Sequence, residues 1–191
     1  DTSALDAAPQ FLQDSLIFPY DSGLAITQEL YDNNGDWGEV NEAYSVMPGL
    51  PGSTEQVITP SDFERDLPKV LPAGTISVPG YELERTSVWG ELGFRIMIDQ
   101  VLGEDTGVEA ADGWGGDYYS QWFNGTNAAL LIVFEGDTNR DTEELFQALT
   151  DYAAAVFETD FASVQIIAGQ LVFVAADEEA VAQLIVTAVS T

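Results

Sequence analysis

The sequence predicts an α+β fold, in which a helical N-terminal half packs on a ββαββα half with a four-stranded antiparallel sheet. Two patterns predict this fold. Apolar residues recur at helical spacing in several segments before Gly113. After Gly113, pairs of short apolar runs are separated by turn residues, and each pair is followed by a helical pattern. The chain of 191 residues can bury one sizeable core, so residues 1–112 and 113–191 are expected to form one compact unit.

The first helix is predicted over residues 9–31, with a break at Phe18-Pro19-Tyr20 because proline removes a backbone donor. The turn-forming residues 32–36 end it, and a short helix is expected at residues 40–46. Residues 48–52 contain two Pro-Gly pairs separated by Leu50, which predicts a rigid loop.

A capping box is predicted next, because Ser53 and Gln56 have the spacing of an N-cap residue and its N3 partner. Residues 59–82 are rich in proline and glycine and have little periodicity. They are expected to form a long connection, with one extended segment near residues 75–78. A helical pattern then covers residues 87–102 and ends at Gly103, before a short helix at residues 108–111.

The second half contains two predicted hairpins that pack helices on one face of the sheet. The first joins strands at residues 118–123 and 128–134 through Asn124-Gly125, and the second joins strands at 164–168 and 171–175. A helix is expected after each hairpin, at residues 142–157 and 177–189, with Asp177 as the N-cap of the last one.

Charge restricts the partners of this chain. It carries 33 acidic and 5 basic residues, which gives a formal net charge of −28. Such a protein repels phosphates, so nucleic acid is not expected as a partner, and neither is an anionic lipid surface. No run of 18 apolar residues is present, so no direct membrane span is expected. Self-association would require salt or cations to screen the charge, so any assembly should weaken at low ionic strength or with a chelator.

The residue inventory argues against most enzyme mechanisms. The chain has no histidine and no cysteine, which removes the usual base near neutral pH, thiol nucleophiles and the commonest zinc ligands. We therefore expect this chain alone not to be an enzyme, and no cofactor is predicted. Calcium or another cation is a candidate ligand at Asp137, Asn139 and Asp141, whose oxygens alternate as at the start of a calcium loop. The spacing then departs from that loop, and a helix cap at Asp141 or Thr142 is the favoured interpretation.

Two further motifs allow more than one interpretation. Asn124-Gly125-Thr126 is a glycosylation sequon, and equally a plain hairpin turn. The segment from Asp112 to Tyr119 is dense in glycine and aromatic residues, which fits a tight turn into a strand better than a ligand platform.

Five segments in order resemble the C-terminal region of secreted bacterial and archaeal proteins that look like His-Glu-x-x-His zinc metallopeptidases. The resemblance covers roughly residues 10–190. The segments begin at Phe18, Asn41, Ser53, Trp89 and Gly113. The positions that match the family's motifs are Pro19, Tyr20, Ser53, Glu55, Gln56, Pro60, Gly90, Glu91, Trp114, Gly116 and Asp117.

The resemblance implies structural roles for these positions rather than catalysis. In that family the zinc-binding helix precedes the Phe-Pro-Tyr segment, and this chain has no histidine to supply it. Thr59 stands where the family usually has histidine before the proline, and Tyr118 stands where it usually has arginine. No catalytic residue therefore transfers, and the matching residues are expected to cap, turn and pack.

The sequence predicts a non-catalytic domain, derived from a metallopeptidase-like scaffold, that works through protein–protein contacts or assembly. Its expected location is extracellular or at the cell surface, with the leader removed and in association with a surface or membrane-anchored complex. Two alternatives stay open. The chain could be the processed C-terminal part of an active zinc metallopeptidase, or an acidic, cation-binding surface or filament protein.

Overall fold

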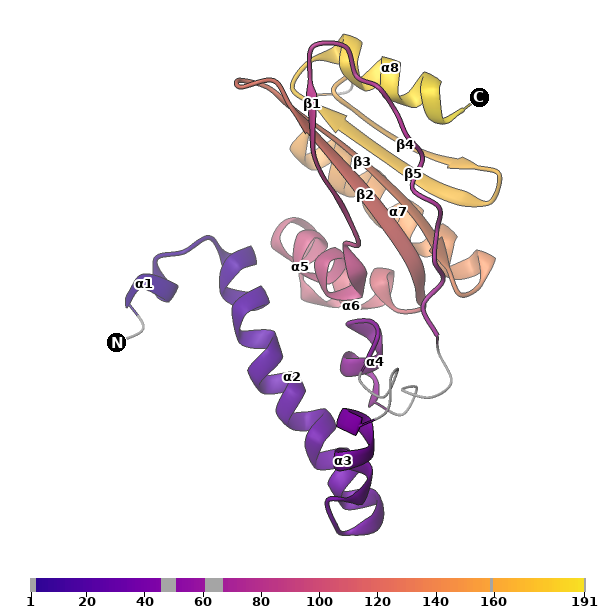
Figure 1. Cartoon of the computed structure of the whole chain (residues 1–191). Coiled ribbons are helices and arrows are strands. Elements are labelled where there is room, and N and C mark those ends of the chain that lie inside the picture. The colour runs from indigo at the N-terminus through magenta and orange to yellow at the C-terminus, as the bar shows by residue number, and fades with distance from the viewer. Residues whose placement is uncertain (1–2, 46–50, 61–66, 159, 191) are drawn as a thin grey trace.

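The computed structural model describes residues 3–45, 51–60, 67–158 and 160–190 (Figure 1). Within these residues one antiparallel sheet has the strand order β1-β2-β3-β5-β4. The strands are β1 (Glu82–Ser87), β2 (Trp114–Phe123), β3 (Ala128–Gly136), β4 (Ala162–Ile167) and β5 (Gln170–Ala176). The predicted α+β fold is confirmed, and both predicted hairpins are present.

The sheet has five strands rather than the predicted four, because β1 was not recognised in the sequence. All six residues of β1 are exposed, so the strand lacks the alternation of apolar and polar residues that identifies a half-buried strand. It pairs with β2 at one edge of the sheet, and its register shifts between Leu83 and Arg85.

One face of the sheet is covered by α5 (Gly90–Leu102), α6 (Glu104–Ala111) and α7 (Asn139–Val156). Four side chains of this layer are fully buried: Phe94 and Ile98 of α5, and Leu145 and Leu149 of α7. They pack against strand residues that include Ile132, in the middle of β3. This layer forms the larger part of the core.

The opposite face is also covered, so the prediction of helices on one face was wrong. Helix α8 (Glu179–Val189) contributes Val181, Ala182 and Ile185 to a second cluster on this face. An extended segment, residues 67–81, crosses the same face and buries Val78 (Figure 1). We call this segment the strap. A sheet whose strands are apolar on both sides needs cover on both sides.

The remaining helices are α1 (Ser3–Asp6), α2 (Gln10–Asn34), α3 (Gly38–Ser45) and α4 (Glu55–Ile58). Helix α2 contacts α3, α4 and α5. It continues through Pro19, so the predicted break was wrong. Proline removes one N–H from the helical ladder, but Pro19 is exposed and the helical residues on both sides outweigh that loss.

Several helix boundaries differ from the predictions. Helix α5 begins three residues later than expected, since residues before Gly90 belong to β1 and its exit. Helix α7 begins at Asn139, with Thr138 as its N-cap. Asp177 does not cap α8, because its carboxylate accepts the N–H of Ala128 at the start of β3 instead (2.7 Å). Val46, the predicted end of α3, and residues 48–50 of the predicted loop lie outside the described residues.

None of the helices within the described residues is long and apolar enough to cross a membrane.

Candidate functional site

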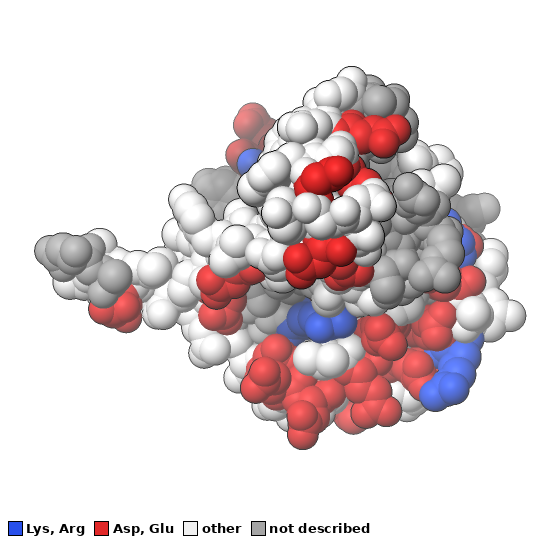
Figure 2. Space-filling view, turned by 90° about the horizontal axis from the view of Figure 1, so that it is seen from below, with Lys and Arg blue, Asp and Glu red and all other residues white. Residues whose placement is uncertain are grey.

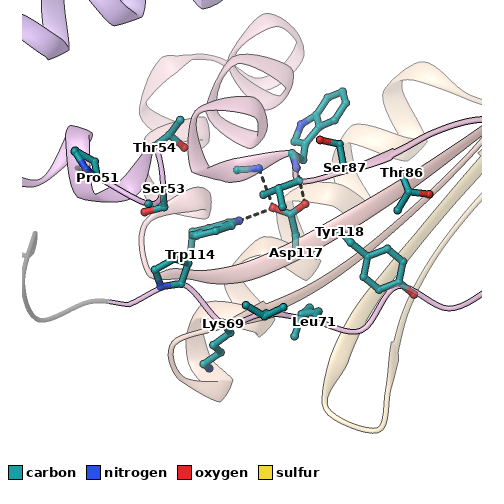
Figure 3. Close-up of a pocket in the computed structure, with 16 residues that line it drawn as sticks. Pro51, Ser53, Thr54, Lys69, Leu71, Thr86, Ser87, Trp114, Asp117 and Tyr118 are labelled. Carbon is teal, nitrogen blue, oxygen red and sulfur yellow. Dashed lines mark hydrogen bonds between the residues drawn. The ribbon is translucent and has the colours of Figure 1, made fainter. Parts of the chain in front are cut away.

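A cavity of about 680 Å³ lies where residues 51–54 before α4, the strap, the segment from the end of β1 to the start of α5, and β2 meet (Figure 3). Its polar groups come from Ser53 and Thr54, from Lys69 of the strap, and from Thr86 and Ser87 at the end of β1. Its walls also contain Trp89, Trp114, Asp117 and Tyr118. Three of the segments that carry the family resemblance, those that begin at Ser53, Trp89 and Gly113, therefore contribute residues to this cavity.

Asp117 is the buried acid of this cavity, with an exposed fraction of 3 %. Its Oδ2 accepts the backbone N–H of Trp89 (2.6 Å), and its Oδ1 accepts the N–H of Gly90 (2.8 Å). The indole N–H of Trp114 also donates to Oδ1 (2.8 Å), as the dashed lines in Figure 3 show. Both carboxyl oxygens are thus engaged at the N-terminus of α5.

This arrangement joins β2 to α5. A helix N-terminus carries unsatisfied N–H groups and a partial positive charge, and a carboxylate stabilises both. Burial raises the pKa of Asp117, while the three N–H donors act in the opposite direction. A raised pKa in a cavity can indicate a catalytic acid, but here the carboxylate faces the backbone and the Trp114 ring. The geometry is that of a structural cap.

Gly116 gives the strap room to pass beside β2. A Cβ atom at this position would lie 2.3 Å from the backbone oxygen of Lys69. The N–H of Lys69 donates to the carbonyl of Gly115 (2.7 Å), which fixes the strap to β2. The Trp-Gly-Gly-Asp motif therefore combines a close backbone approach with the cap made by Asp117, in agreement with its interpretation as a turn into a strand.

The side chain of Lys69 attaches the strap to the end of β3. Its Nζ donates to the carbonyl of Gly136 (2.7 Å) and lies 3.2 Å from Oε1 of Glu135. Gln170 also donates to Glu135 (3.2 Å). The hydrogen bond from Gln170 and the contact with Lys69 lower the pKa of Glu135. This is the only lysine of the chain, and no motif around it in the sequence indicates its role.

The lowered pKa of Glu135 predicts a pH dependence. A carboxylate with a folded-state pKa below its usual value of 4.5 stabilises the fold above that pH, and the effect is lost as pH falls through the folded-state pKa. Glu135→Gln should therefore lower the free energy of unfolding near neutral pH and leave it unchanged in strong acid. Urea unfolding at both pH values measures this difference. Glu84→Gln, at an exposed acid of β1, is the control, and an equal Glu135→Gln deficit at both pH values would contradict the prediction.

The Ser-Thr-Glu-Gln segment attaches α4 to its neighbours. Ser53 Oγ accepts the N–H of Gln56 (3.2 Å), which is one of the two bonds of the predicted capping box, but the N-cap of α4 is Thr54 rather than the predicted Ser53. The reciprocal bond is shifted by one residue, because Gln56 Oε1 accepts the N–H of Gly52 (2.7 Å). Thr54 Oγ1 accepts the N–H of Leu92 in α5 (3.2 Å). Glu55 and Gln56 are buried, so this segment serves packing.

The other motif residues lie around or beyond the cavity. Glu91 is buried in the first turn of α5 and forms an ion pair with Arg95. Pro60 follows α4 and is half-buried. Pro19 and Tyr20 lie on α2, away from the cavity wall, and Tyr20 is 79 % exposed. The structure thus brings most of the motif residues together and leaves Pro19 and Tyr20 exposed on α2.

The candidate cation residues lie at the N-terminus of α7. Asp141 is the N3 residue of a capping box and accepts the N–H of Thr138 (2.7 Å), so the N-cap is Thr138 rather than the predicted Asp141 or Thr142. In the part of the chain that the structure describes, no group of three or more acidic side chains is placed to hold a metal ion. Asp137 and Asn139 flank the cap residue.

Asn124 lies at the tip of the β2–β3 hairpin, as the sequence predicts. It is exposed, and its Oδ1 accepts the N–H groups of Thr126 (3.0 Å) and Asn127 (2.8 Å). This side chain stabilises the turn. Glycosylation at Asn124 stays a prediction.

One known protein family matches the C-terminal part of this chain. A family described as a domain of unknown function, DUF8575, matches residues 79–190, more than half of the chain. The chain belongs to the DUF8575 family. No curated protein and no solved structure matches it.

The DUF8575 match begins just before β1 and ends with α8. It therefore contains the whole sheet, Asp117 and the helices α5 to α8. Helices α1 to α4 and most of the strap precede it. In this member of the DUF8575 family, the cavity forms where that preceding segment folds back onto the family domain. The likeness to metallopeptidase-like secreted proteins stays a prediction.

Proposed function

We propose that this DUF8575 protein is a non-catalytic, secreted or cell-surface domain that works through protein–protein contacts. The observation that carries the proposal is a row of exposed apolar side chains on α2. Helix α2 has 25 residues, and Ile26 is the only one of them that is buried. A helix of this length that buries so little of itself offers an extended surface to a partner.

The row consists of Leu12, Leu16, Tyr20 and Leu24, with Ile17 beside it, and we call it the α2 stripe. Its members are 41–79 % exposed. Spacing of four residues places successive members on one side of a helix. Single exposed apolar residues are ordinary, but a contiguous row along a helix marks an interaction surface. Trp37, 58 % exposed, lies just beyond the end of the same helix.

The charge around the α2 stripe favours a particular kind of partner. The charged residues of α2 are Asp14, Asp21, Glu29 and Asp32, and all are acidic. Acidic side chains are also spread over the face seen from below, where basic ones are few (Figure 2). The partner that fits is a protein with an apolar docking surface and lysine or arginine at its rim, since complementary charge steers association.

The cavity supports a non-catalytic role. The buried carboxylate of Asp117 is held by three N–H donors, and Lys69 is bound to the backbone and to Glu135. A general acid or base must reach the proton that it transfers. Asp117 is buried and Lys69 is engaged by the end of β3, so both groups maintain the junction that carries the N-terminal helices.

Replacing two members of the α2 stripe should abolish partner binding and leave the fold intact. The double variant Leu16→Gln/Leu24→Gln keeps the net charge and alters side chains that are 58 % and 68 % exposed. The tagged protein, expressed in its native source, should co-purify a defined basic partner, and the double variant should lose it at least about tenfold. Dissociation of the wild-type complex should also become easier as salt rises, because the rim contacts are ionic.

The matched control is Val101→Gln/Val156→Gln, at valines that are 40 % and 46 % exposed on α5 and α7. It should bind the partner like the wild type. The proposal fails if both double variants retain the partner equally, or if neither the wild type nor the variants form a complex.

A further inference from the structure

We infer that strand β4 is a docking edge for a second copy of this chain, so that two sheets join antiparallel through their β4 strands. This inference concerns a different surface from the α2 stripe and does not depend on the proposed function. It rests on three observations: which backbone groups of β4 point away from the sheet, a register in which two copies of β4 can pair with each other, and the distribution of charged side chains over the chain.

The hydrogen bonds between β4 and β5 show which backbone groups of β4 point away from the sheet. Strand β4 pairs only with β5 in the described residues, and the N–H of Ala176 donates to the carbonyl of Phe161 (2.9 Å). Phe161 is thus bonded toward β5. Because the direction alternates along a strand, Ala162, Val164 and Ile166 direct their N–H and C=O groups outward.

These three residues allow a symmetric pairing with a second copy. If Val164 lies opposite Val164 of the second copy, Ala162 lies opposite Ile166, and the reverse pair forms by symmetry. All outward N–H and C=O groups of the three residues then find partners, because each opposed pair exchanges two hydrogen bonds. A two-fold interface of this kind closes on itself and gives a dimer rather than a fibre.

Charge selects this edge. In a chain with 33 acidic residues, residues 161–176 carry no charge, and residues 180–191 carry none either. No charged side chain therefore lies on β4, on the β4–β5 turn or on α8 after Glu179. In a molecule of net charge −28, this is the edge at which a second copy meets the least like-charge repulsion.

The nearest described acid before β4 does not oppose itself in the proposed register. Asp160 would lie opposite Ala168, in the β4–β5 turn of the second copy. The two Asp160 residues would be separated by about 26 Å along the strands, well beyond the Debye length of about 8 Å at physiological salt. Added salt should therefore favour the dimer by screening the remaining charge.

The other edge of the sheet has the features that prevent such pairing. Strand β1 carries Glu82, Glu84 and Arg85, and its register shifts beside Arg85. Charged side chains and irregularities are common means of protecting an edge strand. Strand β4, with the sequence Ala-Ser-Val-Gln-Ile-Ile, has neither. This contrast assigns the pairing to β4.

The test combines mass and amide exchange on the full chain. Sedimentation equilibrium should show a monomer of 20.6 kDa at low salt and a dimer as salt and concentration rise. Under dimer conditions, amide exchange should slow at Ala162, Val164 and Ile166, which we expect to exchange freely in the monomer. Val164→Pro removes an outward N–H and should weaken dimerisation at least about tenfold, or ~1.4 kcal/mol.

A second variant covers the case in which Val164→Pro does not fold. Ile166→Glu, at a side chain 42 % exposed, adds charge to the uncharged edge and should also weaken the dimer. Leu83→Glu, at a side chain 54 % exposed on β1, is the matched control and should dimerise like the wild type. The α2 variant Leu16→Gln/Leu24→Gln should dimerise normally as well.

The inference is overturned if the chain stays monomeric at high salt, or if a dimer forms without protection of the three amides. It is also overturned if Ile166→Glu dimerises like the wild type. Loss of the dimer in the α2 variant but not in the β4 variants would place self-association on α2 instead, leaving the protein-contact proposal in place.

Discussion

Asp117→Asn should lower the free energy of unfolding by at least about 2 kcal/mol, since it disrupts a buried cap. In the wild type both oxygens accept N–H bonds, from Trp89, Gly90 and Trp114. An asparagine side chain has one oxygen and one NH₂ group, so at least one of these N–H groups would face another donor. Burial already disfavours the charge of Asp117, so the expected loss of stability comes from this unfavourable donor contact rather than from the change of charge.

Urea unfolding at neutral pH measures this effect. Asp151→Asn, at an exposed aspartate of α7, is the control for the same chemical change on the surface and should stay within about 0.5 kcal/mol of the wild type. If Asp117→Asn were as stable as the control, Asp117 would not be a structural cap, and a chemical role for its carboxylate would have to be considered.

Gly116→Ala should have the second largest effect, a loss of about 1–3 kcal/mol of stability through overpacking. The added Cβ would lie 2.3 Å from the backbone oxygen of Lys69, so either the strap or β2 must move. Movement of the strap would expose the side of the sheet that Val78 covers. We therefore expect faster proteolysis within residues 67–81 as well as a lower melting temperature.

Gly23→Ala is the matched control for the glycine substitution. No atom lies within 4 Å of a Cβ placed at Gly23, and the residue is inside α2. The change should therefore leave stability unchanged or raise it by up to about 1 kcal/mol, because alanine favours helices. A Gly116→Ala variant as stable as Gly23→Ala, with an intact strap, would show that the close approach to Lys69 does not matter.

The strongest parts of the fold could be predicted because their sequence periodicity matches their burial. Strands β3 and β5 have long apolar runs between turn residues, and α7 has its apolar residues on the face that packs against the sheet. Strand β1 could not be predicted this way, since it is a polar edge strand whose pairing depends on β2 rather than on its own pattern. Its exposure also explains why the sheet was predicted one strand too small.

The candidate site was predicted in part. The glycines and aromatic residues around Trp114 indicated a turn, but nothing local to Asp117 in sequence indicated that it would cap a helix that begins 27 residues earlier. The exposure of the α2 stripe could not be predicted from the sequence, for a different reason. Leu12, Leu16 and Leu24 have helical periodicity, which predicts a buried face, whereas the structure leaves them exposed. Periodicity identifies a helix without stating what covers it.

The central claim, that the α2 stripe contacts a partner protein, is tested most directly by site-specific photo-crosslinking in the native source. A photoreactive phenylalanine analogue would replace Tyr20, which is 79 % exposed within the stripe, and in a control chain it would replace Val70, which is 93 % exposed on the strap. We expect one defined protein crosslinked at position 20, with a basic, apolar contact surface, and no such product at position 70. No product at position 20 above the level at position 70 would contradict the claim.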